Sequence, residues 1–173
     1  MGKIVLVGYM GAGKSHVGAL LSEKMNLKFL DLDDLIEKSE GKSIKNIFSE
    51  HGEIYFRKVE SKIFNTVLAS NDDFVLSVGG GTPCYANNHL LLNSENVFSV
   101  YLKASVTTLK DRLIKGKTKR PLIADLDEIE LEEYIAKHLF DRNYYYHQCT
   151  KIISVDAKTP AEIAQEIMTV YSK

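Results

Sequence analysis

The chain lacks most features that mark disulfide-linked, zinc-binding, nucleic-acid-binding or membrane proteins. Its 173 residues include two cysteines, Cys84 and Cys149, with no CxxC spacing, so we expect two reduced thiols and no zinc site. The five histidines show no ligand spacing either. A formal net charge of −1 gives no reason to expect a nucleic-acid partner. The N-terminal apolar run is too short for a signal peptide or a membrane span, so we expect a cytoplasmic protein without a membrane partner.

Repeats, low-complexity tracts and Pro/Ser-rich linkers are absent too, so we expect a single domain over residues 1–173 and a monomer. Short apolar runs alternate with segments of helical period, which predicts an α/β fold with a parallel sheet and helices on both faces. The predicted strands are Ile4–Val7, Phe29–Leu32, Phe74–Val78, Val97–Leu102 and Lys151–Val155.

A glycine-rich segment, Gly8–Ser15, follows the first predicted strand and precedes a helical segment. It fits the pattern G-x-x-x-x-G-K-[ST], in which backbone N–H groups at a helix N-terminus cradle phosphate oxygens. Lys14 would reach the β- and γ-phosphates, and Ser15 would offer its hydroxyl to Mg²⁺. The alternative is a glycine turn that binds nothing, but the strand before it and the helix after it favour a nucleoside triphosphate site.

Two further segments come at predicted C-terminal strand ends, where open α/β sheets bind ligands. Asp31 and Asp33 would both point to one side of their strand, beside the phosphate loop, while Asp33 or Asp34 could cap the next helix. Gly79–Gly81 would let a ligand approach the backbone closely, or would form a flexible hinge. Both segments are candidates for an acceptor site.

Two arginines and one basic segment are harder to interpret from pattern alone. Arg142 falls on the apolar face of a predicted helix and needs an anionic partner, for which a protein carboxylate is slightly favoured over a bound one. Arg57 lies at the edge of a helical stripe, which favours an ordinary surface arginine. Residues 116–127 form either a solvated loop or a lid that closes over the phosphates.

Taken together, these residues resemble the shikimate kinase family over nearly the whole chain. The resemblance rests on the phosphate loop GYMGAGKS, on Phe29–Asp33, on Phe56-Arg57, on Val78–Gly81, on Lys119–Leu122 and on Arg142. It implies a single-domain P-loop kinase fold with a five-stranded parallel sheet and a lid at residues 116–127. It also implies ATP-dependent phosphorylation of the 3-hydroxyl of shikimate, with Mg²⁺ as cofactor.

The resemblance also implies roles for individual residues. Arg57 and Arg142 would hold the shikimate carboxylate, which reverses the pattern-based preference at both positions, and guanidinium groups suit that task because they pair bidentately with carboxylates. Asp33 would contact the acceptor hydroxyls and act as the base, and Asp31 would lie near Mg²⁺. The remaining substrate contacts would be Gly79, Gly80 and Gly81. The nucleotide side would comprise Gly11, Ala12, Gly13, Lys14, Ser15, His16, Arg112 and Arg120, with Lys14 and Arg120 acting on the transferring phosphoryl group.

Two departures and two rival functions accompany this interpretation. His16 stands where the family most often has a small hydroxyl residue, and Arg120 is the one arginine of the lid. The rivals are another small P-loop kinase, acting on gluconate or a nucleoside monophosphate, and a nucleotide-dependent switch. The absence of an Asn-Lys-x-Asp signature disfavours the switch.

Overall fold

The computed structural model describes residues 2–116 and 123–172. Its centre is one five-stranded sheet in the order β2-β3-β1-β4-β5, in which every neighbouring pair is parallel. The strands are β1 (Lys3–Val7), β2 (Lys28–Asp31), β3 (Phe74–Ser77), β4 (Val97–Lys103) and β5 (Lys151–Ser154). All five predicted strands are therefore confirmed, with ends that differ by one residue.

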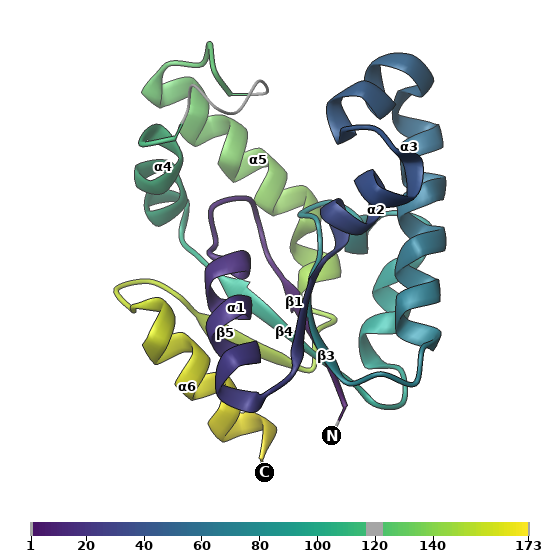
Figure 1. Ribbon diagram of the computed structural model, residues 1–173. Coiled ribbons are helices and arrows are strands. Elements are labelled where there is room, and N and C mark those ends of the chain that lie inside the picture. The colour runs from purple at the N-terminus through teal and green to yellow at the C-terminus, as the bar shows by residue number, and fades with distance from the viewer. Residues whose placement is uncertain (1, 117–122, 173) are drawn as a thin grey trace.

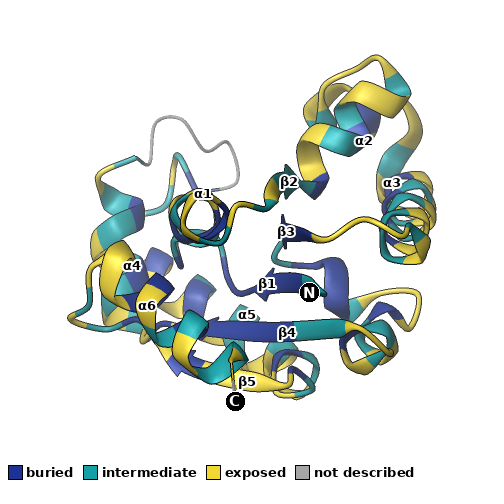
Figure 2. Cartoon of the chain, turned by 60° about the horizontal axis from the view of Figure 1, so that its bottom comes forward, coloured by how far each residue is buried: buried dark blue, intermediate teal, exposed yellow. Residues whose placement is uncertain are grey.

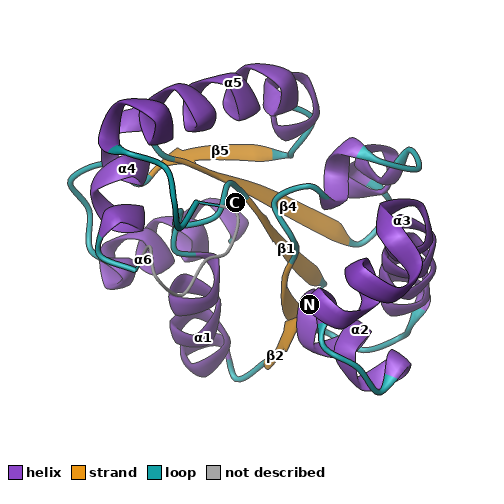
Figure 3. Cartoon of the chain, turned by 90° about the horizontal axis from the view of Figure 1, so that it is seen from above, coloured by secondary structure: helices purple, strands orange, loops and turns teal. Residues whose placement is uncertain are grey.

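Helices cover both faces of the sheet (Figures 1 and 3). One face carries α1 and α6, which pack against each other, and the other carries α3, α5 and the short 3₁₀ turns η1 and η2. The helical elements are α1 (Lys14–Met25), α2 (Leu32–Glu40), α3 (Ile44–Ala69), η1 (Thr82–Cys84), η2 (Asn88–Asn93), α4 (Val106–Ile114), α5 (Glu128–Tyr146) and α6 (Pro160–Tyr171). None of the described helices is long and apolar enough to cross a membrane.

The central strands form the core (Figure 2). Ile4–Val7 of β1 and the whole of β3 are buried, because helices cover both faces of these strands. The apolar runs in the sequence reflect this two-sided burial. The carboxyl ends of β1 and β3 consequently meet at one edge of the sheet, from which the phosphate loop and the glycine segment continue.

Local sequence signals set the helix ends. Ser105 caps α4 and Thr159 caps α6, with Glu162 completing a capping box. Gly52 interrupts α3 with φ 77°, so α3 consists of two helices that meet at this residue. A residue with a side chain would be strained at that φ, which explains why the break falls at a glycine.

A tight contact between α1 and β2 generates a stability prediction. Gly18 is buried, and a Cβ atom added to it would come within 2.4 Å of the Phe29 ring. We expect Gly18→Ala to lower the free energy of unfolding by about 1–3 kcal/mol, since overpacking forces neighbours to move. Denaturant unfolding measures this change, and the double variant Gly18→Ala/Phe29→Leu, which makes room, should recover part of it. Unchanged stability in the single variant would contradict the packing.

Candidate active site

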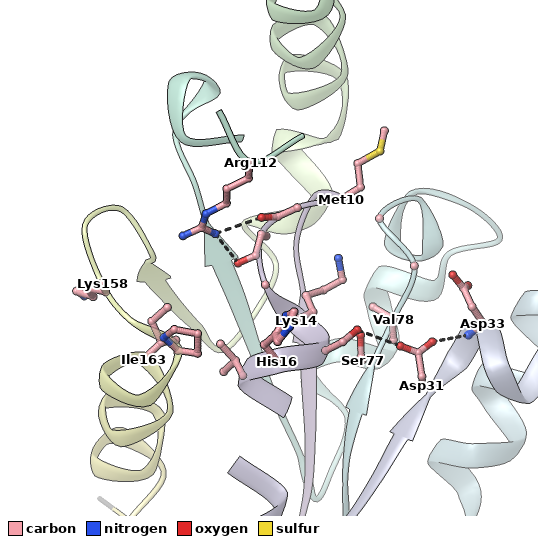
Figure 4. A pocket seen from close by; sticks show the side chains of 18 residues that line it. Met10, Lys14, His16, Asp31, Asp33, Ser77, Val78, Arg112, Lys158 and Ile163 are labelled. Atoms are coloured by element: carbon pink, nitrogen blue, oxygen red, sulfur yellow. Dashed lines mark hydrogen bonds between the residues drawn. The ribbon is translucent and has the colours of Figure 1, made fainter. Parts of the chain in front are cut away.

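A cavity of about 710 Å³ opens at the carboxyl ends of the strands. The phosphate loop forms its floor, with Arg112 and α6 on one side and the carboxylates of Asp31 and Asp33 on the other (Figure 4). Its described lining is Met10, Gly11, Ala12, Gly13, Lys14, Ser15, His16, Val17, Asp31, Asp33, Ser77, Val78, Gly79, Gly80, Arg112, Lys158, Pro160 and Ile163. The cavity therefore has a basic end suited to a nucleotide and an acidic end at Asp31 and Asp33, while Arg57, Gly81 and Arg142 are not among its described lining residues.

The phosphate loop forms as the sequence predicted. Gly13 has φ 97° at the N-terminus of α1, a conformation that places the loop against the first helical turn. Lys14 Nζ donates to the carbonyl oxygens of Gly8 at 2.7 Å and Tyr9 at 3.1 Å. Arg112 Nη1 donates to the carbonyls of Gly11 and Ala12, both at 3.2 Å. Two cations are thereby held at the loop whose N–H groups are suited to phosphate.

Asp31, not Asp33 or Asp34, caps α2. Its Oδ1 accepts from the backbone N–H of Asp33 at 3.0 Å, and α2 begins at Leu32. Asp33 consequently lies in the first turn of α2 and not in the strand. The two carboxylates still face the same cavity.

Oxygen ligands for a metal ion lie next to the phosphate loop. Ser15 Oγ donates to Asp31 Oδ2 at 3.4 Å, and both side chains line the cavity. Within the described ranges, no group of three or more His, Cys, Asp or Glu side chains could hold a metal alone. A hydroxyl and one carboxylate suit Mg²⁺, which prefers oxygen ligands and commonly binds through one or two carboxylates, water and substrate phosphates.

Asp33 has the electrostatics of a base. Partial desolvation in the cavity raises the pKa of Asp33 to about 6, and the nearby carboxylates of Asp31 and Glu60 add to this, while Lys14 opposes it. A carboxylate that titrates close to neutral pH accepts protons more readily than an ordinary aspartate.

The glycine segment brings four charged side chains to one stretch of backbone. A Cβ at Gly79 would lie 3.5 Å from Asp33 Oδ1 and 3.3 Å from Glu60 Oε2. One at Gly80 would lie 3.2 Å from Arg142 Nη1, and one at Gly81 would lie 2.7 Å from Arg57 Nη2. A side chain at Gly81 would collide with Arg57, and one at Gly79 or Gly80 would crowd Glu60 or Arg142, so the glycines allow charged groups to approach the backbone closely.

Arg57 is held on several sides and is not an ordinary surface arginine. Its Nη1 donates to Glu60 Oε1 at 2.8 Å, and its Nε donates to Glu53 Oε1 at 3.4 Å. Glu60 is 1% exposed, and its other oxygen accepts from the Thr82 hydroxyl at 2.7 Å. The guanidinium carbon also lies 4.0 Å from the ring centroid of Tyr85. These contacts orient the guanidinium, and its Nη2 atom lies nearest Gly81.

Arg142 has no protein carboxylate within ion-pair distance among the described residues. Its guanidinium carbon lies 5.4 Å from the Tyr9 ring centroid, and its charge partly offsets the burial that raises the pKa of Tyr146. Burial also raises the pKa of Cys84 to about 11, against the opposing charges of Arg142 and Arg57. Both guanidinium groups therefore lie near one thiol. Because Arg142 has no carboxylate partner among the described residues, the pattern-based preference for a protein carboxylate at this position was wrong.

Sequence reasoning missed two residues of this site. Glu60 lies four residues from both Phe56 and Phe64 on the buried stripe of α3, and an acid in that register could have indicated a buried ion pair. Tyr146 is fully buried and donates to the Gly80 carbonyl at 2.6 Å. It lies four residues after Arg142, a spacing that places both on one helix face.

The predicted lid is described in part. Arg120 lies outside the described residues, as do Lys119 and Pro121. Ile123 is fully buried, and Asp127 caps α5 with a capping box to Glu130. His16 lines the cavity, as does the buried Ser77.

The parallel sheet, the phosphate loop and the neighbouring carboxylates define a P-loop kinase. Residues 10–172 match the family model described as shikimate kinase. A shikimate kinase of Flavobacterium psychrophilum is 55% identical over 167 residues, which are 96% of this chain and 97% of the relative. One of Flavobacterium johnsoniae is 54% identical over 172 residues, covering 99% of this chain and all of the relative. The chain belongs to the shikimate kinase family.

Solved structures agree with this assignment. A shikimate kinase of Bacteroides thetaiotaomicron superposes with a TM-score of 0.89 at 31% identity, covering 99% of this chain and 98% of that one. One of Acinetobacter baumannii, solved in complex with shikimate, gives a TM-score of 0.87 at 31% identity, with 99% and 93% covered. A gluconokinase of Sinorhizobium meliloti gives 0.61 at 20% identity, with 99% and 91% covered, which is a likeness of fold alone.

The raised pKa of Asp33 predicts a pH dependence of activity. We expect kcat/KM for the acceptor to fall below about pH 6, because protonated Asp33 cannot accept the hydroxyl proton. A steady-state pH profile measures this, and Asp33→Asn should be slow at every pH without that inflection. An unchanged inflection in the variant would assign it to another group.

The same shift predicts a pH dependence of stability. Because the folded-state pKa lies above the ordinary value of 3.8, ionised Asp33 opposes folding above about pH 6. Asp33→Asn should therefore have a higher Tm than the wild type at pH 7–8, and the difference should shrink as the pH falls from 6 towards 4. Thermal unfolding over this range measures it, and a lower Tm for the variant at pH 8 would contradict the sign.

Proposed function

We propose that this chain transfers the γ-phosphoryl group of ATP to the 3-hydroxyl of shikimate, giving shikimate 3-phosphate and ADP. The observation that carries the proposal is the convergence of Arg57 and Arg142 on Gly80 and Gly81, beside Asp33 and the phosphate loop. Two cations and one base next to a triphosphate site suit an acceptor that carries both a carboxylate and a hydroxyl. Membership of the shikimate kinase family supports the same acceptor.

The acceptor is held by its two ends. Arg57 and Arg142 bind the carboxylate, and since guanidinium–carboxylate pairs form parallel hydrogen bonds, they fix the orientation of the ring as well as its position. Glu60 and Tyr85 keep Arg57 in place. The glycines Gly79–Gly81 leave room for the ring, and the hydroxyl lies towards Asp33.

Phosphoryl transfer forms a bond from the acceptor oxygen to the γ-phosphorus and breaks the bond from that phosphorus to the ADP oxygen. Asp33 takes the hydroxyl proton as the new bond forms. The transition state is loose, so alignment and charge neutralisation contribute more than basicity. Lys14 turns from the loop carbonyls to the β- and γ-phosphates, and Arg120 of the lid would stabilise the transferring group.

The remaining nucleotide contacts come from Gly11–Gly13, Ser15, His16 and Arg112. Ser15 and Asp31 would hold Mg²⁺, which supplies neutralisation of charge on the phosphate oxygens when it is bound. Every residue of the proposed site belongs to one chain. We therefore propose that a monomer is sufficient for activity and that it works in the cytoplasm, where ATP is available.

An ADP-release assay with different acceptors tests the proposed function. We expect release that depends on Mg²⁺ and ATP and is stimulated by shikimate, but not by gluconate or a nucleoside monophosphate. Stimulation by gluconate or the nucleotide instead would assign the chain to another kinase activity. Release that no acceptor changes would favour the nucleotide-dependent switch.

Substitutions in the proposed site separate binding from chemistry. Arg57→Lys should raise the shikimate KM by about 10- to 100-fold with a small change in kcat, because a lysine cannot make the paired hydrogen bonds. Asp33→Asn should chiefly lower kcat, by about 100-fold or more, since it loses the proton acceptor. Steady-state kinetics measure both, and Arg120→Ala should resemble Asp33→Asn. A near-normal shikimate KM in Arg57→Lys would remove Arg57 from the carboxylate site.

A further inference from the structure

Tyr9 of the phosphate loop contacts both halves of the site. On the nucleotide side, its carbonyl oxygen accepts from Lys14 Nζ at 3.1 Å and from the N–H of Ala12 at 3.1 Å. Its side chain is 1% exposed, contacts helix α5 and is not among the described lining residues of the cavity. A single residue therefore joins the phosphate loop to the helix that carries Arg142.

The side chain of Tyr9 makes two contacts with α5. Its hydroxyl shares a hydrogen bond of 2.9 Å with His138 Nδ1, and its ring lies 5.4 Å from the guanidinium carbon of Arg142. His138 and Arg142 are four residues apart, so they lie on the same face of α5. Tyr134 packs edge-on against the imidazole from the preceding turn, with ring centroids 4.2 Å apart. The His138 ring is thereby held between Tyr134 and Tyr9.

The charges around this pair favour a neutral imidazole. Burial lowers the pKa of His138, and the charges of Arg142 and Lys137 lower it further, against the opposing carboxylate of Asp141. Burial raises the pKa of Tyr9 far above its ordinary value. The hydrogen bond thus joins two neutral groups, and the positive charge of Arg142 helps to keep the imidazole neutral.

We propose that Tyr9 and His138 are positioning residues that hold Arg142 against the phosphate loop and so couple nucleotide binding to acceptor binding. The inference rests on the proposed role of Arg142 as a carboxylate ligand. When a triphosphate draws Lys14 away from the Tyr9 carbonyl, the loop adjusts at Tyr9. The bond to His138 carries that adjustment to the turn of α5 that bears Arg142.

A purely structural role is the alternative, because a buried tyrosine hydroxyl needs a partner wherever it lies. The two roles differ in what they change. A structural bond alters stability, whereas a positioning bond also alters the affinity for the acceptor and its dependence on nucleotide.

Four variants of the intact chain test the proposal. Tyr9→Phe and His138→Leu should each raise the shikimate KM by about 3- to 10-fold, roughly the effect of one lost hydrogen bond, with kcat within about twofold. The double variant should be no worse than either single one, because both remove the same bond. His138→Gln, whose amide can donate or accept, should restore most of the affinity.

Calorimetry of shikimate binding measures the coupling directly. We expect a non-hydrolysable ATP analogue to tighten shikimate binding to the wild type by at least threefold, and to change it by less than twofold in Tyr9→Phe and His138→Leu. Absence of tightening in the wild type, or equal tightening in the variants, would overturn the coupling.

Tyr171→Phe is the matched control. It also removes one partly buried tyrosine hydroxyl, which accepts from the N–H of Gly2 at 2.7 Å, but it does so far along α6 from the cavity lining. It should lower the Tm without changing the shikimate KM. If Tyr9→Phe and His138→Leu behave in the same way, the bond is structural and the proposal fails while the proposed function stands. A wild type without shikimate-dependent ADP release would overturn both.

Discussion

The close approach of charged side chains to a backbone without side chains is the constraint on which this site depends. Gly79–Gly81 follow strand β3, and Asp33, Glu60, Arg57 and Arg142 all come within contact distance of a Cβ placed there. Glu60 of the Arg57–Glu60 pair is 1% exposed, so removing Arg57 would leave a buried carboxylate without its ion pair. The glycines therefore permit both the acceptor pocket and the ion pair that shapes it.

Sheet topology explains why these groups meet beside a phosphate loop. In the order β2-β3-β1-β4-β5 the chain places β1 centrally, then builds β2 and β3 on one side of it and β4 and β5 on the other. Where the direction of strand order changes in this way, the ligand-binding crevice lies outside the carboxyl ends of the strands. Residues after β1, β2 and β3 supply the phosphate loop and the acidic side, and α4 and α6 supply the opposite wall.

Three residues show how far pattern reasoning extends. We expected one aspartate at the end of β2 to cap the next helix and another to take part in the chemistry. The choice of Asp31 as the cap depends on the backbone conformation, since all three aspartates are equally good caps. Periodicity placed Arg142 on the buried face of its helix but could not identify the groups that surround it. Glu60 lies on the same buried stripe of α3 as Phe56. The apolar pattern of that stripe gave no sign of an ion pair, although the partner, Arg57, is only three residues away.

The sequence by itself determined the class of fold, the five strands and the phosphate loop, because these depend on residues close together in the chain. It also indicated the family through motifs whose order and spacing are local to each segment. Tertiary structure decided which charges are paired. Tyr9 and His138, which share a hydrogen bond, are 129 residues apart in the chain. Ser61 donates a hydrogen bond to Asn88, which lies 27 residues further along. Such contacts depend on how helices pack across a sheet, and no local period encodes that distance.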